Sequence, residues 1–170
     1  MQTLQELLVE LWFLGVSQEK IDQWVIQYVE EVHPIIDEEI FELLDCITVG
    51  DSENLLLSLA QKKIPNFSET SEEIENLSAK LLLKNLQSYL KEEISPNVLC
   101  RMIVNMECTF LGAPRSMPTG VAYYPEWLGD LWNACDWCDD SWTFENSPHL
   151  ASKVEQQVLK IKEWLLKSKL

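Results

Sequence analysis

Apolar residues recur every three or four positions along most of the chain, with polar residues between them. This spacing places the apolar side chains on one face of an α-helix, whereas a strand would alternate every second residue. We find no convincing strand alternation and no Asn-Gly or Asp-Gly hairpin turn. The pattern predicts an all-α protein of about seven or eight helices, packed as a bundle or as stacked helix hairpins. The apolar positions that mark the predicted helices span residues 3–14, 21–32, 35–47, 55–59, 71–93, 98–110, 127–135 and 148–168, and Ser17 is placed to cap the second helix.

Residues that typically begin and end helices lie at the predicted boundaries. Gly15 is placed to end the first helix, because glycine tolerates a left-handed backbone there. Gly50-Asp51-Ser52 reads as a turn with a capping residue. Thr70 and Glu73 form the T-x-x-E pattern of a capping box before a long predicted helix. A capping residue followed by proline, which suits a first helical turn, occurs twice, at Ser95-Pro96 and Ser147-Pro148.

The length and composition are those of a globular protein. A chain of 170 residues with 46% hydrophobic and 24% charged residues is large enough for one domain with its own core. We predict a single helical domain over residues 1–170. The alternative is a subdivision near residues 65–70, which would give helical hairpins at 1–64 and a bundle with the Trp-rich segment at 71–170.

The sequence carries no sign of membrane insertion or export. No apolar run approaches the ~20 residues that a membrane-spanning helix requires. The N-terminal stretch contains Glu6 and Glu10 instead of the basic residues that open a secretory signal. We therefore expect a cytoplasmic protein whose five cysteines stay reduced.

The net charge of −15 is the strongest global property of the chain. It argues against nucleic-acid binding, which needs a basic surface for the phosphates, and it suits a basic protein partner. Residues 1–95 carry 6 Lys and Arg against 19 Asp and Glu, a net −13. Residues 96–170 carry 7 against 9, a net −2, so most of the charge lies in the first half.

The most acidic stretch runs from Ile21 to Gln61, with ten carboxylates and no Lys or Arg. A chain that keeps such self-repulsion can gain fast, salt-dependent association with a basic protein. The alternative is that the charge serves solubility alone. The predicted partner-binding carboxylates are Glu30, Glu31, Asp37, Glu38, Glu39, Glu42 and Asp45. The helix predicted at 35–47 would turn one apolar face to the core, with Ile36, Ile40, Leu43, Leu44 and Ile47.

Residues 121–144 combine four tryptophans with five carboxylates and contain no Lys or Arg. A helical stripe there would bury Trp127, Leu128, Leu131, Trp132 and Cys135, and Pro125 would lie in the first turn. Tryptophan is usually buried, but it is also enriched among the residues that dominate protein interfaces. We interpret the segment as a core element whose later part reaches a partner. The predicted contacts are Asp136, Trp137, Asp139, Asp140 and Trp142.

The motifs of metal and redox chemistry are incomplete. Cys135 and Cys138 form a C-x-x-C, but they lie at the predicted end of a helix, where the dipole disfavours a thiolate. A zinc site needs two more ligands, and no second C-x-x-C or H-x3–5-H supplies them. Cys100 and Cys108 are spaced to lie near one face of a helix as small core residues. We expect no metal and no cofactor. Besides the cysteines, two histidines have side chains of the kind that binds metals, His33 and His149.

No enzyme motif occurs in the chain, which has no G-x-G-x-x-G, no P-loop and no G-x-S-x-G. Neither histidine has a Ser, Cys or Asp neighbour that would indicate a catalytic triad. We therefore predict a protein without enzymatic activity and assign no catalytic residue. The alternative is a metal-dependent hydrolase that uses the carboxylates of residues 126–140, although a solvated acidic face is the simpler explanation of these carboxylates.

In general character the chain resembles the small acidic helical immunity proteins of bacterial toxin systems. The resemblance rests on size, charge, the absence of motifs, the helix-rich first half and the segment YPEWLGDLWNACDWCDD. It implies that the protein binds and blocks a cognate toxin domain, often a basic nuclease, inside the producing cell. No residue role follows from it. The other hypothesis is a helical adaptor or scaffold with no toxin partner.

Overall fold

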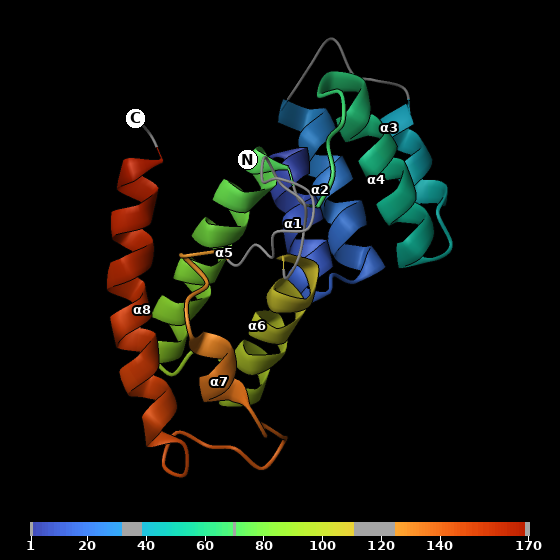
Figure 1. Cartoon of the computed structure of the whole chain (residues 1–170). Helices are drawn as coiled ribbons and strands as arrows, with labels where there is room; N and C mark the ends of the chain where they lie inside the picture. Colours follow the sequence, from blue (N-terminus) through green and yellow to red (C-terminus); the bar gives the residue numbers. More distant parts are fainter. Residues whose placement is uncertain (1, 32–38, 70, 111–124, 169–170) are drawn as a thin grey trace. The chain divides into compact units, whose positions relative to one another are not determined.

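The computed structural model describes residues 2–31, 39–69, 71–110 and 125–168 (Figure 1). Every regular element in these ranges is helical, which confirms the predicted all-α fold. The chain divides into two compact units, residues 1–68 and 69–170. Whether these units are one domain or two stays a prediction. The elements are α1 (Leu4–Leu14), α2 (Gln18–Glu31), α3 (Glu39–Glu42), the 3-10 helix η1 (Leu43–Asp45), α4 (Val49–Lys63), α5 (Glu72–Leu90), α6 (Pro96–Phe110), α7 (Leu131–Cys135) and α8 (Pro148–Lys167).

The first unit is built around α1, whose apolar side chains are nearly all buried. Two tryptophan N–H groups are satisfied inside this unit, as buried indoles require. Nε1 of Trp12 donates to Glu53 Oε1 at 3.0 Å, and Nε1 of Trp24 donates to the Gln2 carbonyl at 2.9 Å. The fully buried Phe67 packs its ring 6.4 Å from that of Trp12 and joins the segment after α4 to the core.

The helix boundaries of the first unit differ from the predictions in two places. Helix α4 begins at Val49, so the predicted turn at 50–52 lies within its first turn, because the Thr48 hydroxyl caps it and accepts from the Asp51 N–H at 3.1 Å. The segment predicted as one helix at 35–47 is instead the short α3 followed by η1 in its described part. Helix α1 ends before Gly15, whose φ of 71° confirms the predicted stop.

The core of the second unit forms between α5 and α8, with α6 and α7 packed beside them (Figure 1). Trp127 is its central side chain and is fully buried. Its ring meets Phe110 edge to face at 5.3 Å, and its Nε1 donates to Glu75 Oε1 at 2.9 Å. Gln157 on α8 donates to the Trp127 carbonyl at 2.6 Å. The predicted core position of Trp127 is therefore confirmed, and a buried carboxylate satisfies its polar atom.

The helix predicted at 127–135 is shorter than expected, because α7 covers only Leu131–Cys135. Gly129 interrupts the helical backbone with a φ of 58°, so Pro125 lies in the preceding turn rather than in a first helical turn. The helix buries Leu131, Ala134 and Cys135. Trp132 lies off that face and is 39% exposed, which corrects its predicted place in the core.

Two further capping predictions are wrong in detail. The N-cap of α5 is Ser71, one residue after the predicted cap Thr70, which lies outside the described residues. Ser147 precedes α8 as predicted, but its hydroxyl donates to the Thr143 carbonyl instead of capping the helix. Pro96 and Pro148 do begin α6 and α8, where the missing proline N–H removes no helical hydrogen bond.

Candidate protein-binding surfaces

Trp137 is the most exposed tryptophan that the structure describes, with 87% of its surface accessible. It lies two residues after the end of α7 and has a φ of 68°, an uncommon backbone conformation for a residue other than glycine. The turn is closed by the Cys138 N–H, which donates to the Cys135 carbonyl at 3.0 Å. The preceding residue, Asp136, is exposed as well. A large apolar side chain thus lies beside a carboxylate on the surface.

The other predicted carboxylates of this segment are also on the surface. Asp139 accepts hydrogen bonds from the Ser141 hydroxyl and from the Ser141 N–H, and these bonds lower the pKa of its carboxyl. Asp140 accepts a hydrogen bond from the side-chain amide of Asn97. We call the group Asp136, Trp137, Asp139 and Asp140 the Trp137 surface.

Trp142 differs from Trp137 although both were predicted to contact a partner. It is partly buried, and its ring packs edge to face against the imidazole of His149 at 5.2 Å. His149 in turn lies 3.3 Å from the Ala134 carbonyl through Nε2. Trp142 is therefore held against α8 and offers a partner less surface than Trp137 does.

The carboxylates predicted in the first unit fall into three groups. Glu30 and Glu31 are exposed in the last turn of α2, where Glu31 accepts a hydrogen bond from Gln27 at 2.9 Å. Glu42 and Asp45 are exposed on α3 and η1, and Glu39 pairs with Lys62. The third group, Asp37 and Glu38, lies outside the described residues.

The same part of the first unit exposes three large apolar side chains that sequence reasoning missed. Phe41 is 45% exposed, Leu44 is 43% exposed and Ile47 is 92% exposed. Leu44 and Ile47 were predicted to face the core, and the structure contradicts this. An α-helical period over 35–47 would have buried them, but the chain changes to the 3-10 helix η1 at Leu43 and is no longer helical at Ile47. The one sign of this exposure in the sequence was that Glu42 and Asp45 stand directly beside Phe41 and Leu44.

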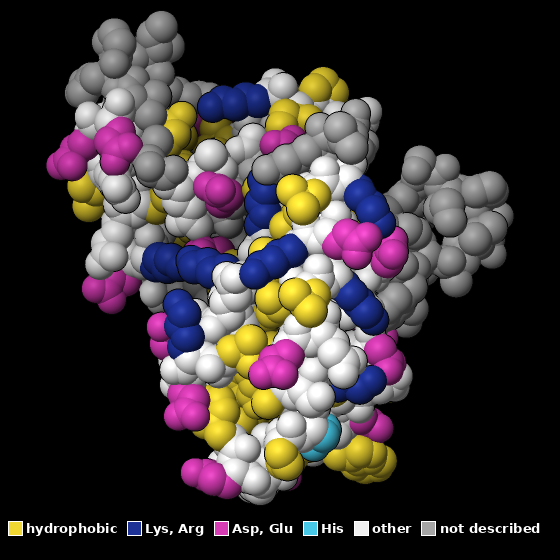
Figure 2. Space-filling model, turned by 90° about the vertical axis from the view of Figure 1, so that its left-hand side faces the viewer, with side chains coloured by type: hydrophobic (Ala, Val, Ile, Leu, Met, Phe, Trp, Pro, Cys, Tyr) yellow, Lys and Arg dark blue, Asp and Glu magenta, His cyan; other side chains and the backbone are white. Residues whose placement is uncertain are grey.

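The outward face of α8 forms a third surface of a different kind (Figure 2). Leu159 and Leu166 are 70% and 69% exposed, on a helix that also carries lysine and glutamate residues. Glu163, for example, pairs with Lys167 at 2.8 Å within the helix. Because both signs of charge are interspersed there, the face does not select a basic or an acidic partner.

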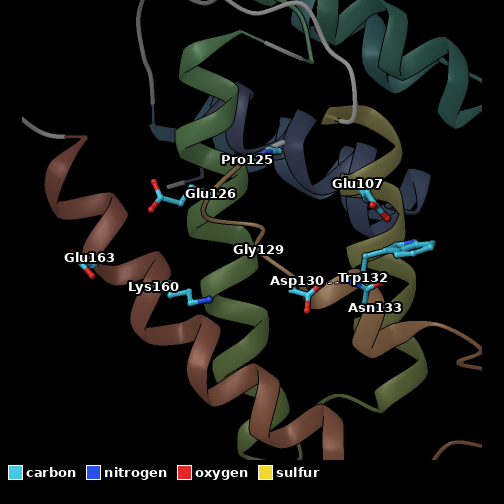
Figure 3. Close-up of a pocket in the computed structure, with 9 residues that line it drawn as sticks. All are labelled: Glu107, Pro125, Glu126, Gly129, Asp130, Trp132, Asn133, Lys160 and Glu163. Atoms are coloured by element: carbon cyan, nitrogen blue, oxygen red, sulfur yellow. Dashed lines mark hydrogen bonds between the residues drawn. The ribbon is translucent and has the colours of Figure 1, made fainter. Parts of the chain in front are cut away.

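An open hollow of about 680 Å³ lies in the second unit beside α7 and α8 (Figure 3). Its carboxylates come from separate elements and point in different directions around it, not toward one point. Burial raises the pKa of Glu107, and Asp130 lies 3.6 Å from Lys153. The residues that line the hollow are Glu107, Pro125, Glu126, Gly129, Asp130, Trp132, Asn133, Lys160 and Glu163.

The hollow bears on the hydrolase alternative, which needs convergent carboxylates. Of the predicted cluster at 126–140, only Glu126 and Asp130 line it, while Asp139 and Asp140 line a smaller pocket of about 240 Å³. Within the described ranges, no group of three or more His, Cys, Asp or Glu side chains could hold a metal ion. The hydrolase stays a hypothesis that no observed geometry favours.

Three thiols meet at the smaller pocket, those of Cys100, Cys135 and Cys138. A hydrogen bond with Cys135 and burial raise the pKa of Cys100, and burial raises the pKa of Cys138 to about 12. The thiols of Cys100 and Cys138 therefore stay protonated at neutral pH and are poor nucleophiles. Cys100 is buried as predicted, whereas Cys108 is exposed and does not belong to the core. His33 lies outside the described residues.

These observations define the class of the protein as an all-α chain in two compact units, whose acidic surfaces expose large apolar side chains. Comparison with known protein families, with characterised proteins and with solved structures gives no match. None of the described helices is long and apolar enough to cross a membrane. The resemblance to immunity proteins stays a hypothesis.

Proposed function

We propose that this chain is a protein-binding module of the immunity type, which binds a basic bacterial toxin domain in the cytoplasm and blocks it. The observation that carries the proposal is Trp137, which is 87% exposed between carboxylates. An exposed tryptophan gains the apolar contact of a partner and is a typical interface hot spot. The carboxylates around it would occupy cationic groups of the toxin.

Electrostatics support a basic partner. The chain has a net charge of −15, and the Trp137 surface adds three exposed aspartates to a single tryptophan. Complementary charge accelerates association and makes its rate fall as salt is added. A nuclease toxin would suit this surface, because it must itself present cations to bind phosphates.

A specific observation also favours the adaptor alternative. Exposed apolar side chains beside carboxylates occur in both compact units, around Trp137 in one and around Ile47 in the other. Two separate surfaces would let one chain bind two partners. The inhibitor and the adaptor differ in affinity, since a cognate inhibitor binds tightly and rapidly whereas an adaptor often binds with a micromolar Kd.

The test is capture of partners from the source cell by the full chain at low and high salt, followed by binding kinetics with the captured protein. Trp137→Ala should raise Kd roughly 30-fold or more, mainly through faster dissociation. Asp136→Asn with Asp139→Asn should slow association at low salt and leave dissociation nearly unchanged. Leu159→Ala, on the mixed-charge face of α8, is the matched control and should leave both rates unchanged.

The inhibitor hypothesis requires more than binding. The captured partner must be basic, and its toxic activity must fall in proportion to the chain added until the two are equimolar. A partner that binds with a micromolar Kd and is not toxic would support the adaptor instead. Wild-type kinetics for Trp137→Ala would exclude the Trp137 surface from the contact.

A further inference from the structure

Three of the large apolar side chains exposed in the first unit lie within seven positions of the chain, whereas Ile26 lies apart from them in the sequence, on α2. In a 3-10 turn, side chains three residues apart are eclipsed. Ile40 and Leu43 are three apart and fully buried, whereas Phe41 and Leu44 are three apart and exposed. Ile47 continues the exposed set in the bend after η1. We call Phe41, Leu44 and Ile47 the Ile47 row.

Two carboxylates flank the Ile47 row. Glu42 and Asp45, again three residues apart, are both exposed. Neither makes an ion pair with any residue that the structure describes, whereas Glu39 is paired with Lys62. The surface therefore presents apolar side chains beside carboxylates that pair with no cation among the described residues. Single exposed apolar residues are ordinary, but three within seven positions form a patch.

We propose that the Ile47 row is a docking surface for a basic amphipathic helix of a partner protein. The row offers apolar contacts to leucine or similar side chains, which stand at positions i, i+3 or i+4, and i+7 of such a helix. Glu42 and Asp45 supply the charge that the helix meets with Lys or Arg beside its apolar stripe. The occupant is thus defined by charge complementarity together with apolar spacing.

The other occupants fit less well. A second copy would bring its own net −15, of which residues 1–68 carry −10 from 3 Lys and 13 Asp and Glu, so the two surfaces would repel. An anionic membrane would repel the same carboxylates. The inference goes beyond the proposed function, because it concerns another compact unit and does not require the Trp137 surface to bind.

The test uses the full chain and two synthetic peptides of about 15–20 residues, long enough to form a helix. One carries leucine on one face and lysine on the other, and the second replaces every lysine with glutamate. Binding is measured by fluorescence anisotropy and mapped by amide chemical shifts. We expect the lysine peptide to bind and to perturb residues 41–47, and the glutamate peptide to bind at least tenfold more weakly.

Variants then separate this surface from the others. Ile47→Ser with Phe41→Ser should weaken the lysine peptide tenfold or more, and Glu42→Lys with Asp45→Lys should weaken it at low salt. The control, Leu159→Ser with Leu166→Ser, removes equally exposed leucines from α8 and should change nothing. Trp137→Ala should also leave the affinity unchanged, which keeps this outcome distinct from failure of the proposed function.

Several outcomes would overturn the inference. Equal binding of both peptides would mean unspecific apolar contact, and loss of binding only in Trp137→Ala would place the site in the second unit. Concentration-dependent dimerisation abolished by Ile47→Ser would make a second copy the occupant, and binding only to anionic vesicles would make it a lipid surface. A lower unfolding midpoint for Ile47→Ser without peptide would mean that the side chain is already covered.

Discussion

At the scale of single residues, Gly129 shows most clearly how the core of the second unit is held. It has a φ of 58°, and a Cβ at this position would lie 2.3 Å from Oε1 of Gln157. Gln157 is itself buried and donates to the Trp127 carbonyl. Glycine therefore allows the turn, the close approach of α8 and the hydrogen bond that fixes Trp127, all at one position.

We predict that Gly129→Ala lowers the free energy of unfolding by about 2–4 kcal/mol, from backbone strain and displacement of the Gln157 amide. Urea denaturation followed by tryptophan fluorescence measures it. Gly50→Ala is the matched control: it lies in the first turn of α4 with its nearest neighbour 3.8 Å away, and should be neutral or stabilise by up to about 1 kcal/mol. Equal stability of Gly129→Ala and wild type would contradict this account.

At the scale of elements, local hydrogen bonds decide where helices begin. Helix α1 starts with a complete capping box, in which the Glu6 N–H donates to Thr3 Oγ1 at 3.2 Å and the Thr3 N–H donates to Glu6 Oε2 at 2.8 Å. The T-x-x-E pattern at 70–73 looks the same in sequence, yet α5 uses Ser71 as its N-cap. Two matching motifs therefore have different outcomes, because packing selects the first residue of a helix.

We predict that Thr3→Ala lowers the unfolding free energy by about 1 kcal/mol, since it leaves N–H groups at the start of α1 without an acceptor. Thr3→Ser keeps the hydroxyl and should stay within about 0.5 kcal/mol of wild type. Chemical denaturation compares the variants, and hydrogen exchange of the first turn of α1 localises the effect. A Thr3→Ser variant as unstable as Thr3→Ala would show that the methyl group, and not the cap, matters.

At the scale of the whole molecule, negative charge is divided unequally between the compact units. Residues 1–68 carry −10, from 3 Lys and 13 Asp and Glu, and residues 69–170 carry −5, from 10 Lys and Arg and 15 Asp and Glu. Among the described residues, only a few ion pairs offset this in the first unit, such as Lys20 with Glu10 at 2.5 Å. Like charge at that density opposes the compact state.

We predict that NaCl stabilises the first unit more than the second, because salt screens repulsion between exposed carboxylates. Hydrogen exchange with mass spectrometry resolves the two units, and protection of α1 and α4 should rise between low and physiological salt more than that of α5 and α8. An uncharged osmolyte is the control and should affect both units alike. A loss of protection in the first unit on adding salt would contradict the prediction.

The carboxylates and Trp137 of the candidate binding surfaces could be read from the sequence, but the exposed apolar side chains near η1 could not. Glu30, Glu42, Asp45 and Trp137 lie on the surface, and whether they contact a partner stays a prediction. Ile47 and Leu44 were assigned to the core because a helical period was extended through residues 43–47. A change from 3.6 to 3 residues per turn has no signature in hydrophobic spacing alone.

The sequence by itself determined the helical fold class, the negative charge and the near absence of chemical motifs, because these follow from local periodicity and composition. Only the tertiary structure decided which apolar residues are buried. It buries Trp127 fully but leaves Trp132, which shares the predicted apolar stripe, 39% exposed. The reason is physical: burial depends on backbone rotation at Gly129 and after α7, and on partners such as Glu75 and Gln157 that lie far away in the sequence.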